Sequence, residues 1–228
     1  MDIMASYINT RSSGLVDNLN EHFFHILGCG AIGSSAATQL CRMGAENFAL
    51  YDMYKVETPN IGVSQYNQCH IGMNKTAALK ELLIDINHEI DVTEHFGLFS
   101  NYYWNSNDDI IILGFDSMKS RLDAVETLCQ FKNARPKYII DGRMGAEHYQ
   151  QYIIEQPTLL KYKKYWYSDE EGSTEPCNAK ATSYCSNMSG SFIANSVRKL
   201  IMGQPYNRNF SFNFPIMLLE KTPLISKL

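Results

Sequence analysis

The sequence lacks several features that would place it in a common class of protein. No apolar run approaches the ~18 residues of a membrane-spanning helix, and the first residues show no basic stretch followed by an apolar one, as a secretory signal would. No block of lysine and arginine stands out, the densest being residues 161–164, and the net charge is −4. These absences argue against a membrane or nucleic acid as a partner. We therefore expect a cytoplasmic protein that binds neither.

Cysteine is present, but not in a structural pattern. The six cysteines contain no C-x-x-C pair, so a tetrahedral zinc site is not indicated, and they are too few for a disulfide scaffold in 228 residues. Cys41 and Cys129 fall at the spacing of helix core positions, whereas Cys177 follows Pro176 in a polar stretch. We expect Cys177 to be the most exposed of the three.

The composition is that of an ordinary globular protein. Apolar residues make up 45% of the chain and charged residues 19%, which is enough to build a core. The length suits one large domain, and no linker or repeat interrupts it. We expect residues 1–228 to form a single domain, with a nucleotide-binding half at about 20–142 and a C-terminal elaboration at about 143–228.

A glycine pattern near the N-terminus is the most informative feature of the chain. Gly28, Gly30 and Gly33 fit G-x-G-x-x-G between an apolar strand and a helix, and Asp52 follows Gly33 by 19 residues at the end of the next strand. In this pattern the glycines allow a tight turn, close approach of a phosphate and close packing of helix on strand, while the acid accepts the ribose hydroxyls. The pattern predicts an adenine nucleotide site.

Alternating apolar segments predict the fold. We expect strands around residues 25–27, 48–52, 109–115 and 138–142, with helices at about 34–43 and 74–87 and a third with Met118, Leu122, Val125 and Cys129 on one face. After residue 142 we expect an antiparallel strand at 148–155, a polar loop at 168–181, a helix at 189–202 and a last strand at 210–220 broken by Pro215. The fold class is α/β: a Rossmann-like, doubly wound, mostly parallel sheet extended by antiparallel strands.

Two charged residues distinguish this site from a nicotinamide site. Lys75 begins the second helix and can present a cation to phosphates, and Asp116 follows a buried strand at its carboxyl end, where it could hold Mg²⁺ on a triphosphate. A polar loop from Asn60 to Gln65 lies between them in the sequence. Each has a simpler interpretation: Asp116 could cap the third helix, and Lys75 could be solvated.

These residues, in this order, resemble the ThiF/MoeB/HesA superfamily, the bacterial relatives of ubiquitin-activating enzymes. Three later segments resemble a subgroup of stand-alone bacterial and phage members; they are residues 141–147, 176–182 and 191–194. The resemblance implies adenylation of a carboxylate with ATP and Mg²⁺, the carboxylate being the C-terminus of a ubiquitin-like or sulfur-carrier protein. It also implies a homodimer, and the apolar run 210–219 would need cover.

The resemblance assigns roles to individual residues. Asp52 would hold the ribose, and Asp116 would be the metal ligand. Asn60, Gln65 and Lys75 would contact the phosphates. Cys177 lies where some members carry a cysteine that forms a thioester or persulfide.

The chain departs from the family at one phosphate-binding position. Many members have an arginine immediately before the loop glutamine, where this chain has Ser64. Either Arg11 or Arg121 would then have to compensate, or activity would be reduced. An inactive nucleotide-binding partner protein therefore remains an alternative to the adenylating enzyme, and an NAD-dependent oxidoreductase is a third.

Three further side chains have structural interpretations. His25 lies on a buried strand, which favours a hydrogen-bonded core histidine over a metal ligand. Arg143 and Glu147 could form a structural pair near the site or contact substrate.

Overall fold

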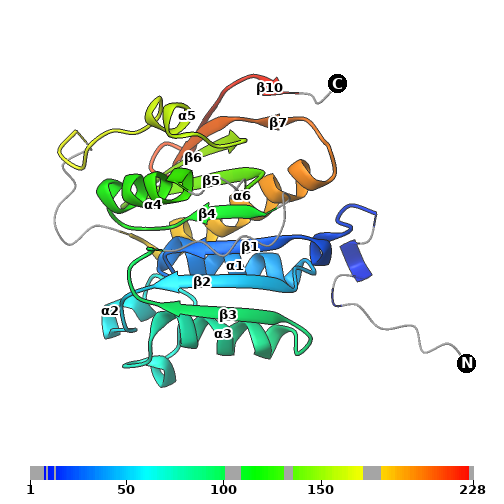
Figure 1. Cartoon of the computed structure of the whole chain (residues 1–228), viewed down its shortest axis with the longest axis vertical. Coiled ribbons are helices and arrows are strands. Elements are labelled where there is room, and N and C mark those ends of the chain that lie inside the picture. The colour runs from blue at the N-terminus through cyan, green and yellow to red at the C-terminus, as the bar shows by residue number, and fades with distance from the viewer. Residues whose placement is uncertain are drawn as a thin grey trace, which may run out of the picture.

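The protein is built around one large twisted sheet (Figure 1). The structure, a computed structural model, describes residues 8, 10–12, 14–100, 109–130, 136–171 and 181–225. The sheet has eight strands in the order β3-β2-β1-β4-β5-β6-β8-β9, and β7 pairs separately with β10. The strands are β1 (Phe23–Leu27), β2 (Asn47–Asp52), β3 (Asp91–Phe96), β4 (Ile110–Leu113), β5 (Tyr138–Gly145), β6 (His148–Glu155), β7 (Tyr206–Asn207), β8 (Asn209–Asn213), β9 (Leu218–Lys221) and β10 (Leu224–Ile225).

The first five strands pair in parallel and the remainder of the sheet is antiparallel. Helices connect β1 to β2, β2 to β3 and β4 to β5, whereas β5, β6, β8 and β9 pair as antiparallel neighbours. The helical segments are η1 (Thr10–Ser12), η2 (Leu19–Glu21), α1 (Ala31–Arg42), α2 (Thr58–Ile61), η3 (Gln68–His70), α3 (Lys75–Ile86), α4 (Met118–Gln130), α5 (Leu159–Lys163) and α6 (Ser183–Ile201). The expected Rossmann-like fold with an antiparallel extension is confirmed.

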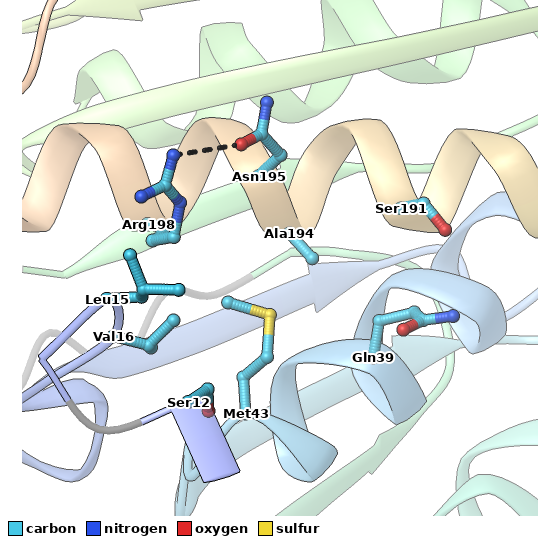
Figure 2. Close-up of a pocket in the computed structure, with 9 residues that line it drawn as sticks. All are labelled: Ser12, Leu15, Val16, Gln39, Met43, Ser191, Ala194, Asn195 and Arg198. Atoms are coloured by element: carbon cyan, nitrogen blue, oxygen red, sulfur yellow. Dashed lines mark hydrogen bonds between the residues drawn. The ribbon is translucent and has the colours of Figure 1, made fainter. Parts of the chain in front are cut away.

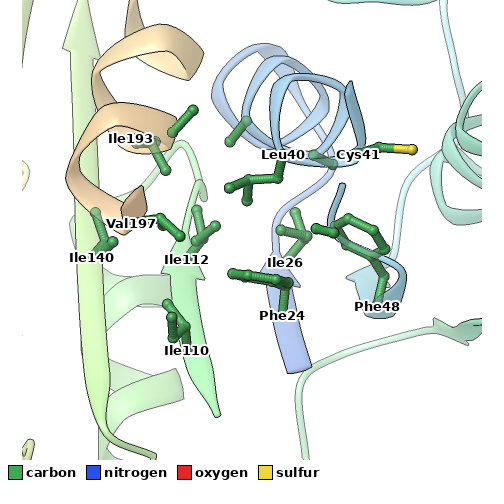
Figure 3. Close-up of a cluster of buried hydrophobic side chains, with 14 of the residues drawn as sticks. Phe24, Ile26, Leu40, Cys41, Phe48, Ile110, Ile112, Ile140, Ile193 and Val197 are labelled. Carbon is green, nitrogen blue, oxygen red and sulfur yellow. The ribbon is translucent and has the colours of Figure 1, made fainter. Parts of the chain in front are cut away.

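Two apolar clusters fix the helices on opposite faces of the sheet. Phe24 and Ile26 of β1, with Ile112 of β4, point toward Leu40 of α1 and Val197 of α6 (Figure 3). The alternate side chains face the second cluster, beneath α4 and α5. This period-two alternation makes both faces of the central strands apolar. Burying each large aliphatic side chain stabilises the fold by roughly 1.5–3 kcal/mol.

Helices α1 and α6 lie unusually close together at one point. A Cβ atom placed on Gly190 of α6 would lie 2.2 Å from Ser35 Oγ and 2.6 Å from the Ser35 carbonyl carbon. Nearby, the Ser186 hydroxyl donates to the Ala31 carbonyl oxygen at 2.9 Å. The first turns of α6 are therefore fixed against the first turn of α1.

Two predicted helices begin earlier than expected. Helix α1 starts at Ala31 and not Ser34, because only Gly28 and Gly30 form the turn and Gly33 is already helical. Helix α6 starts at Ser183 and not Ser189. The sequence does not indicate this earlier start, because the first residues of the helix are polar and show no apolar periodicity. Gly44 and Gly203, which follow the two helices, have the positive φ values of C-terminal glycines, 99° and 63°.

The last predicted strand is wrong in its topology. The run 210–220 forms two strands, β8 and β9, joined by a turn in which Met217 N donates to Phe214 O at 3.1 Å. Pro215 lies in that turn and not in an edge strand.

The prediction that Cys129 occupies a core position is also wrong. Cys129 is exposed at the end of α4, and Leu128 takes the core position. Within the described residues, no helix is both long and apolar enough to traverse a bilayer.

Candidate functional site

The turn between β1 and α1 has the shape that the glycine pattern predicts. Gly28 has φ +92°, and a Cβ on it would lie 2.7 Å from Phe115 N. A Cβ on Gly33 would lie 1.9 Å from the Gly28 carbonyl oxygen, whereas a Cβ on Gly30 would meet nothing within 4 Å. Gly28 and Gly33 are therefore required by packing. Gly30 faces open space before the first amides of α1, where a phosphate could approach.

Asp52 lies at the end of β2, beside this turn. Its carboxylate accepts hydrogen bonds from Cys29 N and Tyr54 N, each at 2.8 Å. Burial raises the pKa of the Asp52 carboxyl; the nearby Asp116 carboxylate acts in the same direction, and the Lys75 ammonium opposes it. Each carboxylate oxygen receives one amide and keeps a lone pair, so the group can still accept ribose hydroxyls.

Lys75 and Asp116 converge on Asp52 from different elements. Lys75 N donates to Tyr54 O at 3.0 Å, two residues beyond Asp52, and Gly114 N donates to Leu27 O at 2.7 Å, which brings the segment before Asp116 beside the glycine turn. Both charges also act on the pKa of Asp52, although the three residues are up to 64 positions apart in the sequence. Lys75 is the first residue of α3, and its ammonium lies 5.5 Å from the centre of the Tyr54 ring. The arrangement gathers one cation and two carboxylates at the carboxyl edge of the parallel strands, where ligands bind in such sheets.

The capping interpretation of Asp116 is not supported. Ser117 Oγ accepts from Ser120 N at 3.0 Å, and the Asp169 carboxylate accepts from Met118 N at 2.7 Å, so other side chains serve the start of α4. Asp116 itself is exposed. Its carboxylate can therefore hold a metal ion.

The loop from Asn60 to Gln65 is held by hydrogen bonds at both ends. Asn60 Oδ1 accepts from Glu57 N at 2.9 Å, which leaves the Asn60 amide nitrogen as a donor. Gln65 N donates to Ser34 Oγ at 3.2 Å. Ser64, which replaces the expected arginine, donates its hydroxyl to Asn60 O at 2.6 Å. The loop offers amide donors to a phosphate but no cation.

Neither arginine proposed to compensate can do so within this chain. Arg121 is 3% exposed and donates to Leu113 O, Phe115 O and Asp141 Oδ1. Arg11 lies in η1, whose Ser12 lines a cavity with Met43 at the far end of α1. At 1.5 Å per residue, the length of α1 separates that end from Gly30 by about 18 Å. Of the two alternatives, compensation by Arg11 or Arg121 and reduced activity, the positions of the two arginines favour the second.

That cavity is distinct from the nucleotide site. It has a volume of about 260 Å³ and lies between η1, the end of α1 and the middle of α6 (Figure 2). Leu15, Val16 and Met43 supply its apolar side, and Arg198 and Asn195 its polar side. None of the residues expected to bind the nucleotide lines it.

Several residues that contact the site belong to no recognisable sequence motif. The Tyr66 hydroxyl lies 2.5 Å from Cys29 O and 3.1 Å from Lys75 O, so it joins the glycine turn to the start of α3. Gln65 Nε2 donates to Asn187 Oδ1 of α6 at 2.7 Å. These contacts join segments that are distant in sequence, and no local motif marks them.

A buried ionic cluster supports the loop that precedes Asp116. Asp141 is fully buried and accepts from Arg121, from Arg143 at 2.7 Å and from the Tyr162 hydroxyl at 3.2 Å. Arg143 thus pairs with Asp141, while Glu147 accepts from Tyr184, so the expected Arg143–Glu147 pair does not form. Since Arg121 also holds the carbonyls of Leu113 and Phe115, the cluster fixes the backbone leading to Asp116.

His25 has the structural role that the sequence favoured. Its Nε2 lies 3.2 Å from Asp109 and its Nδ1 3.3 Å from the Tyr51 hydroxyl, with the ring fully buried. Burial lowers the pKa of the imidazole. Cys177, the candidate nucleophile, lies outside the described residues.

The strand–turn–helix geometry and the parallel sheet define a Rossmann-like fold with a ligand site at its carboxyl edge. The profile of the ThiF family matches residues 6–226, nearly the whole sequence. The chain belongs to the ThiF family.

Several activating enzymes are similar to part of the sequence. Ubiquitin-like modifier-activating enzyme 5 of Arabidopsis thaliana is 37% identical over 86 residues, covering 36% of this chain and 20% of that protein. The same enzyme of Rattus norvegicus is 30% identical over 128 residues, covering 50% and 32%. The matches span only about a fifth to a third of the length of these relatives.

Solved structures share the fold over most of the chain. E. coli MccB crystallised with ATP has a TM-score of 0.68 at 19% identity, covering 93% of this chain and 67% of that one. PaaA has a TM-score of 0.69 at 18% identity, covering 92% and 66%. At this identity the likeness concerns the fold.

Proposed function

We propose that this protein uses Mg-ATP to adenylate a carboxylate, that of the C-terminus of a ubiquitin-like or sulfur-carrier protein. The observation that carries the proposal is the convergence of Asp52, Lys75 and Asp116 beside the open glycine turn. Membership of the ThiF family and similarity to activating enzymes support the same reaction. We also propose that residues 1–228 act as one adenylation domain.

Each residue has a role that its position supports. Asp52 accepts the ribose hydroxyls, and the open face of Gly30 and the first amides of α1 receive phosphate oxygens. Asn60, Gln65 and Lys75 donate to the phosphates. A magnesium ion held by Asp116 would neutralise charge on the departing pyrophosphate.

The reaction forms one bond and breaks one at the α-phosphorus. A carboxylate oxygen of the partner attacks phosphorus, the bond to the bridging oxygen breaks, and pyrophosphate leaves with the electron pair. The acyl-adenylate can then be attacked by a thiolate, which releases AMP and forms a thioester; Cys177 is the candidate for this second step. The chain contributes positioning and electrostatic stabilisation.

Pyrophosphate exchange tests the proposal directly. With candidate partner peptides ending in a free carboxylate, the protein should incorporate labelled pyrophosphate into ATP. Asp116→Ala should abolish exchange, because the metal would be poorly held. Asp123→Ala is the matched control, since this exposed carboxylate pairs only with Lys119 among the described contacts and exposed pairs of this kind contribute little to stability. Exchange that persists in Asp116→Ala would place the metal elsewhere.

One observation favours a second candidate function, a nucleotide-binding member without turnover. Ser64 supplies no charge and bonds to Asn60, so the loop lacks the cation that many members have. Such a protein would be stabilised by Mg-ATP yet show no exchange with any partner. Stabilisation by NAD equal to that by Mg-ATP would instead support the oxidoreductase alternative and contradict both.

We further propose that the protein is a homodimer. The hairpin of β8 and β9 exposes four consecutive apolar residues, which are Ile216, Met217, Leu218 and Leu219. Their side chains are 44–71% exposed, and β9 is the edge strand of the sheet. An exposed apolar strip at a sheet edge is typical of an interface.

A further inference from the structure

Asn187 of α6 reaches across to the phosphate loop. Its Oδ1 accepts from Gln65 Nε2 at 2.7 Å, and its Nδ2 donates to Ser183 O, one turn earlier in the same helix, at 2.9 Å. The two residues are separated by 122 positions in the sequence. No role follows for Asn187 from the glycine turn, the ribose acid or the metal ligand.

The hydrogen bond to Ser183 fixes which way the Asn187 amide points. A carbonyl oxygen can only accept, so Nδ2 must face Ser183 and Oδ1 must face Gln65. Gln65 must in turn present Nε2 to Asn187. One hydrogen of that nitrogen is used, and the other is free to donate to a phosphate oxygen.

Both partners are anchored to the helix that follows the glycine turn. Gln65 N donates to Ser34 Oγ, and Ser34 is fully buried in the first turn of α1. The first turn of α6 is anchored to the same place through Ser186 and Ala31 at 2.9 Å, and Gly190 allows the close approach. Asn187 therefore has a fixed position relative to the site where the phosphates would bind.

We infer that Asn187 is a positioning residue, which holds the Gln65 amide in the orientation that donates to the nucleotide phosphates. The inference rests on the proposed function, because it requires ATP at the glycine turn. A free glutamine side chain loses substantial rotamer entropy when it is fixed on a ligand. Asn187 removes most of that cost before the nucleotide arrives, so its effect should appear in affinity for the triphosphate.

Asn187→Ser removes the hydrogen bond to Gln65 without removing the hydrogen bond that Asn187 makes within α6. Serine can still donate to the carbonyl four residues earlier but is too short to reach Gln65. Asn187→Ala is the second variant, and Asn195→Ala is the matched control, an exposed asparagine two turns later on the same helix. Binding of Mg-ATP and of adenosine is measured by isothermal titration calorimetry, with urea unfolding as a check of folding.

Both Asn187 variants should weaken Mg-ATP binding by about three- to tenfold, with adenosine binding unchanged. Asn187→Ser should also unfold as wild type does. Asn195→Ala should behave as wild type. The double variant Gln65→Ala with Asn187→Ala should bind ATP no more weakly than Gln65→Ala alone, because Asn187 acts through Gln65.

Three results would overturn the inference: wild-type ATP affinity in Asn187→Ser, equal losses for ATP and adenosine, or additive losses in the double variant. Failure of the wild-type protein to bind Mg-ATP would overturn the proposed function itself. Normal wild-type binding with an unaffected Asn187→Ser would overturn only the role of Asn187.

Discussion

An added methyl group should have different effects at two glycines of the glycine turn: it should lower stability at Gly33 and weaken nucleotide binding at Gly30. In Gly33→Ala the new Cβ would lie 1.9 Å from the Gly28 carbonyl oxygen and 3.0 Å from Ile26 Cγ2. Ordinary contact begins near 3.4 Å, so the turn or the helix must shift by more than 1 Å. In Gly30→Ala the Cβ meets nothing within 4 Å, and φ is −78°, outside the positive range that disfavours a side chain.

The geometry sets the expected magnitudes. Gly33→Ala should lose about 3 kcal/mol of unfolding free energy, the upper end of the range for overpacking, and its Tm should fall by about 6–12 °C. Gly30→Ala should change stability by less than about 1 kcal/mol but place its methyl where a phosphate would approach. At a ligand concentration of about 100 times Kd, Mg-ATP adds about 2.7 kcal/mol to wild type, or about 5–10 °C.

Thermal unfolding with and without Mg-ATP measures both effects. Wild type should show the ligand-induced rise in Tm, and Gly30→Ala should show a normal Tm with little or no rise. Gly33→Ala should unfold at lower temperature even without ligand. A full ligand-induced rise in Gly30→Ala would refute the placement of phosphate at this turn, and an unchanged Tm in Gly33→Ala would refute the packing argument.

Four further outcomes are expected. Burial lowers the pKa of His25 in the folded state, so the unfolded state binds the proton at a higher pH than the folded state does. The contribution of His25 to the unfolding free energy should therefore be fully present above pH ~6.5 and decrease toward pH 5, as measured by urea unfolding at each pH. An equally steep decrease of the unfolding free energy in His25→Gln would contradict this. Gly190→Ala should lower the Tm, since its Cβ meets the backbone of α1, at a cost of about 1–3 kcal/mol; a wild-type Tm would show that the two helices can separate freely. Cys177→Ala should retain pyrophosphate exchange but lose a thiol-sensitive adduct with the partner, whereas survival of the adduct would make the cysteine structural. Met217→Glu should convert a dimer to a monomer in light scattering, and a wild type that is already monomeric at micromolar concentration would rule the dimer out.

The glycine turn and the sheet could be predicted because their signals are local. The spacing of three glycines, the acid 19 residues later and the apolar strands are read within short windows, and the structure reproduces them. Asp116 was placed correctly at a strand end, but only the hydrogen bonds of Ser117 and Asp169 show that it does not cap α4.

Features that depend on distant residues could not be predicted. The Gln65–Asn187 contact joins a loop to a helix whose first turn is polar and looked like part of a loop. From the sequence alone, Arg121 could bind a phosphate. The structure shows that it is instead buried and paired with Asp141. The β8–β9 hairpin was missed because its turn uses Met217 at φ +52° in place of a glycine.

The buried cluster around Asp141 bears on how fast an anion reaches the site. Two arginines share one carboxylate, so the cluster carries one excess positive charge beneath the carboxyl edge of β4 and β5, although the whole chain has a net charge of −4. Buried charges are screened less by salt than exposed ones. With Lys75, this charge offsets the two carboxylates of the site, Asp52 and Asp116. The site should therefore repel a triphosphate less than the net charge of −4 implies, and the on-rate of ATP should change little with ionic strength. An on-rate that increased with salt would show that the overall negative charge controls the encounter.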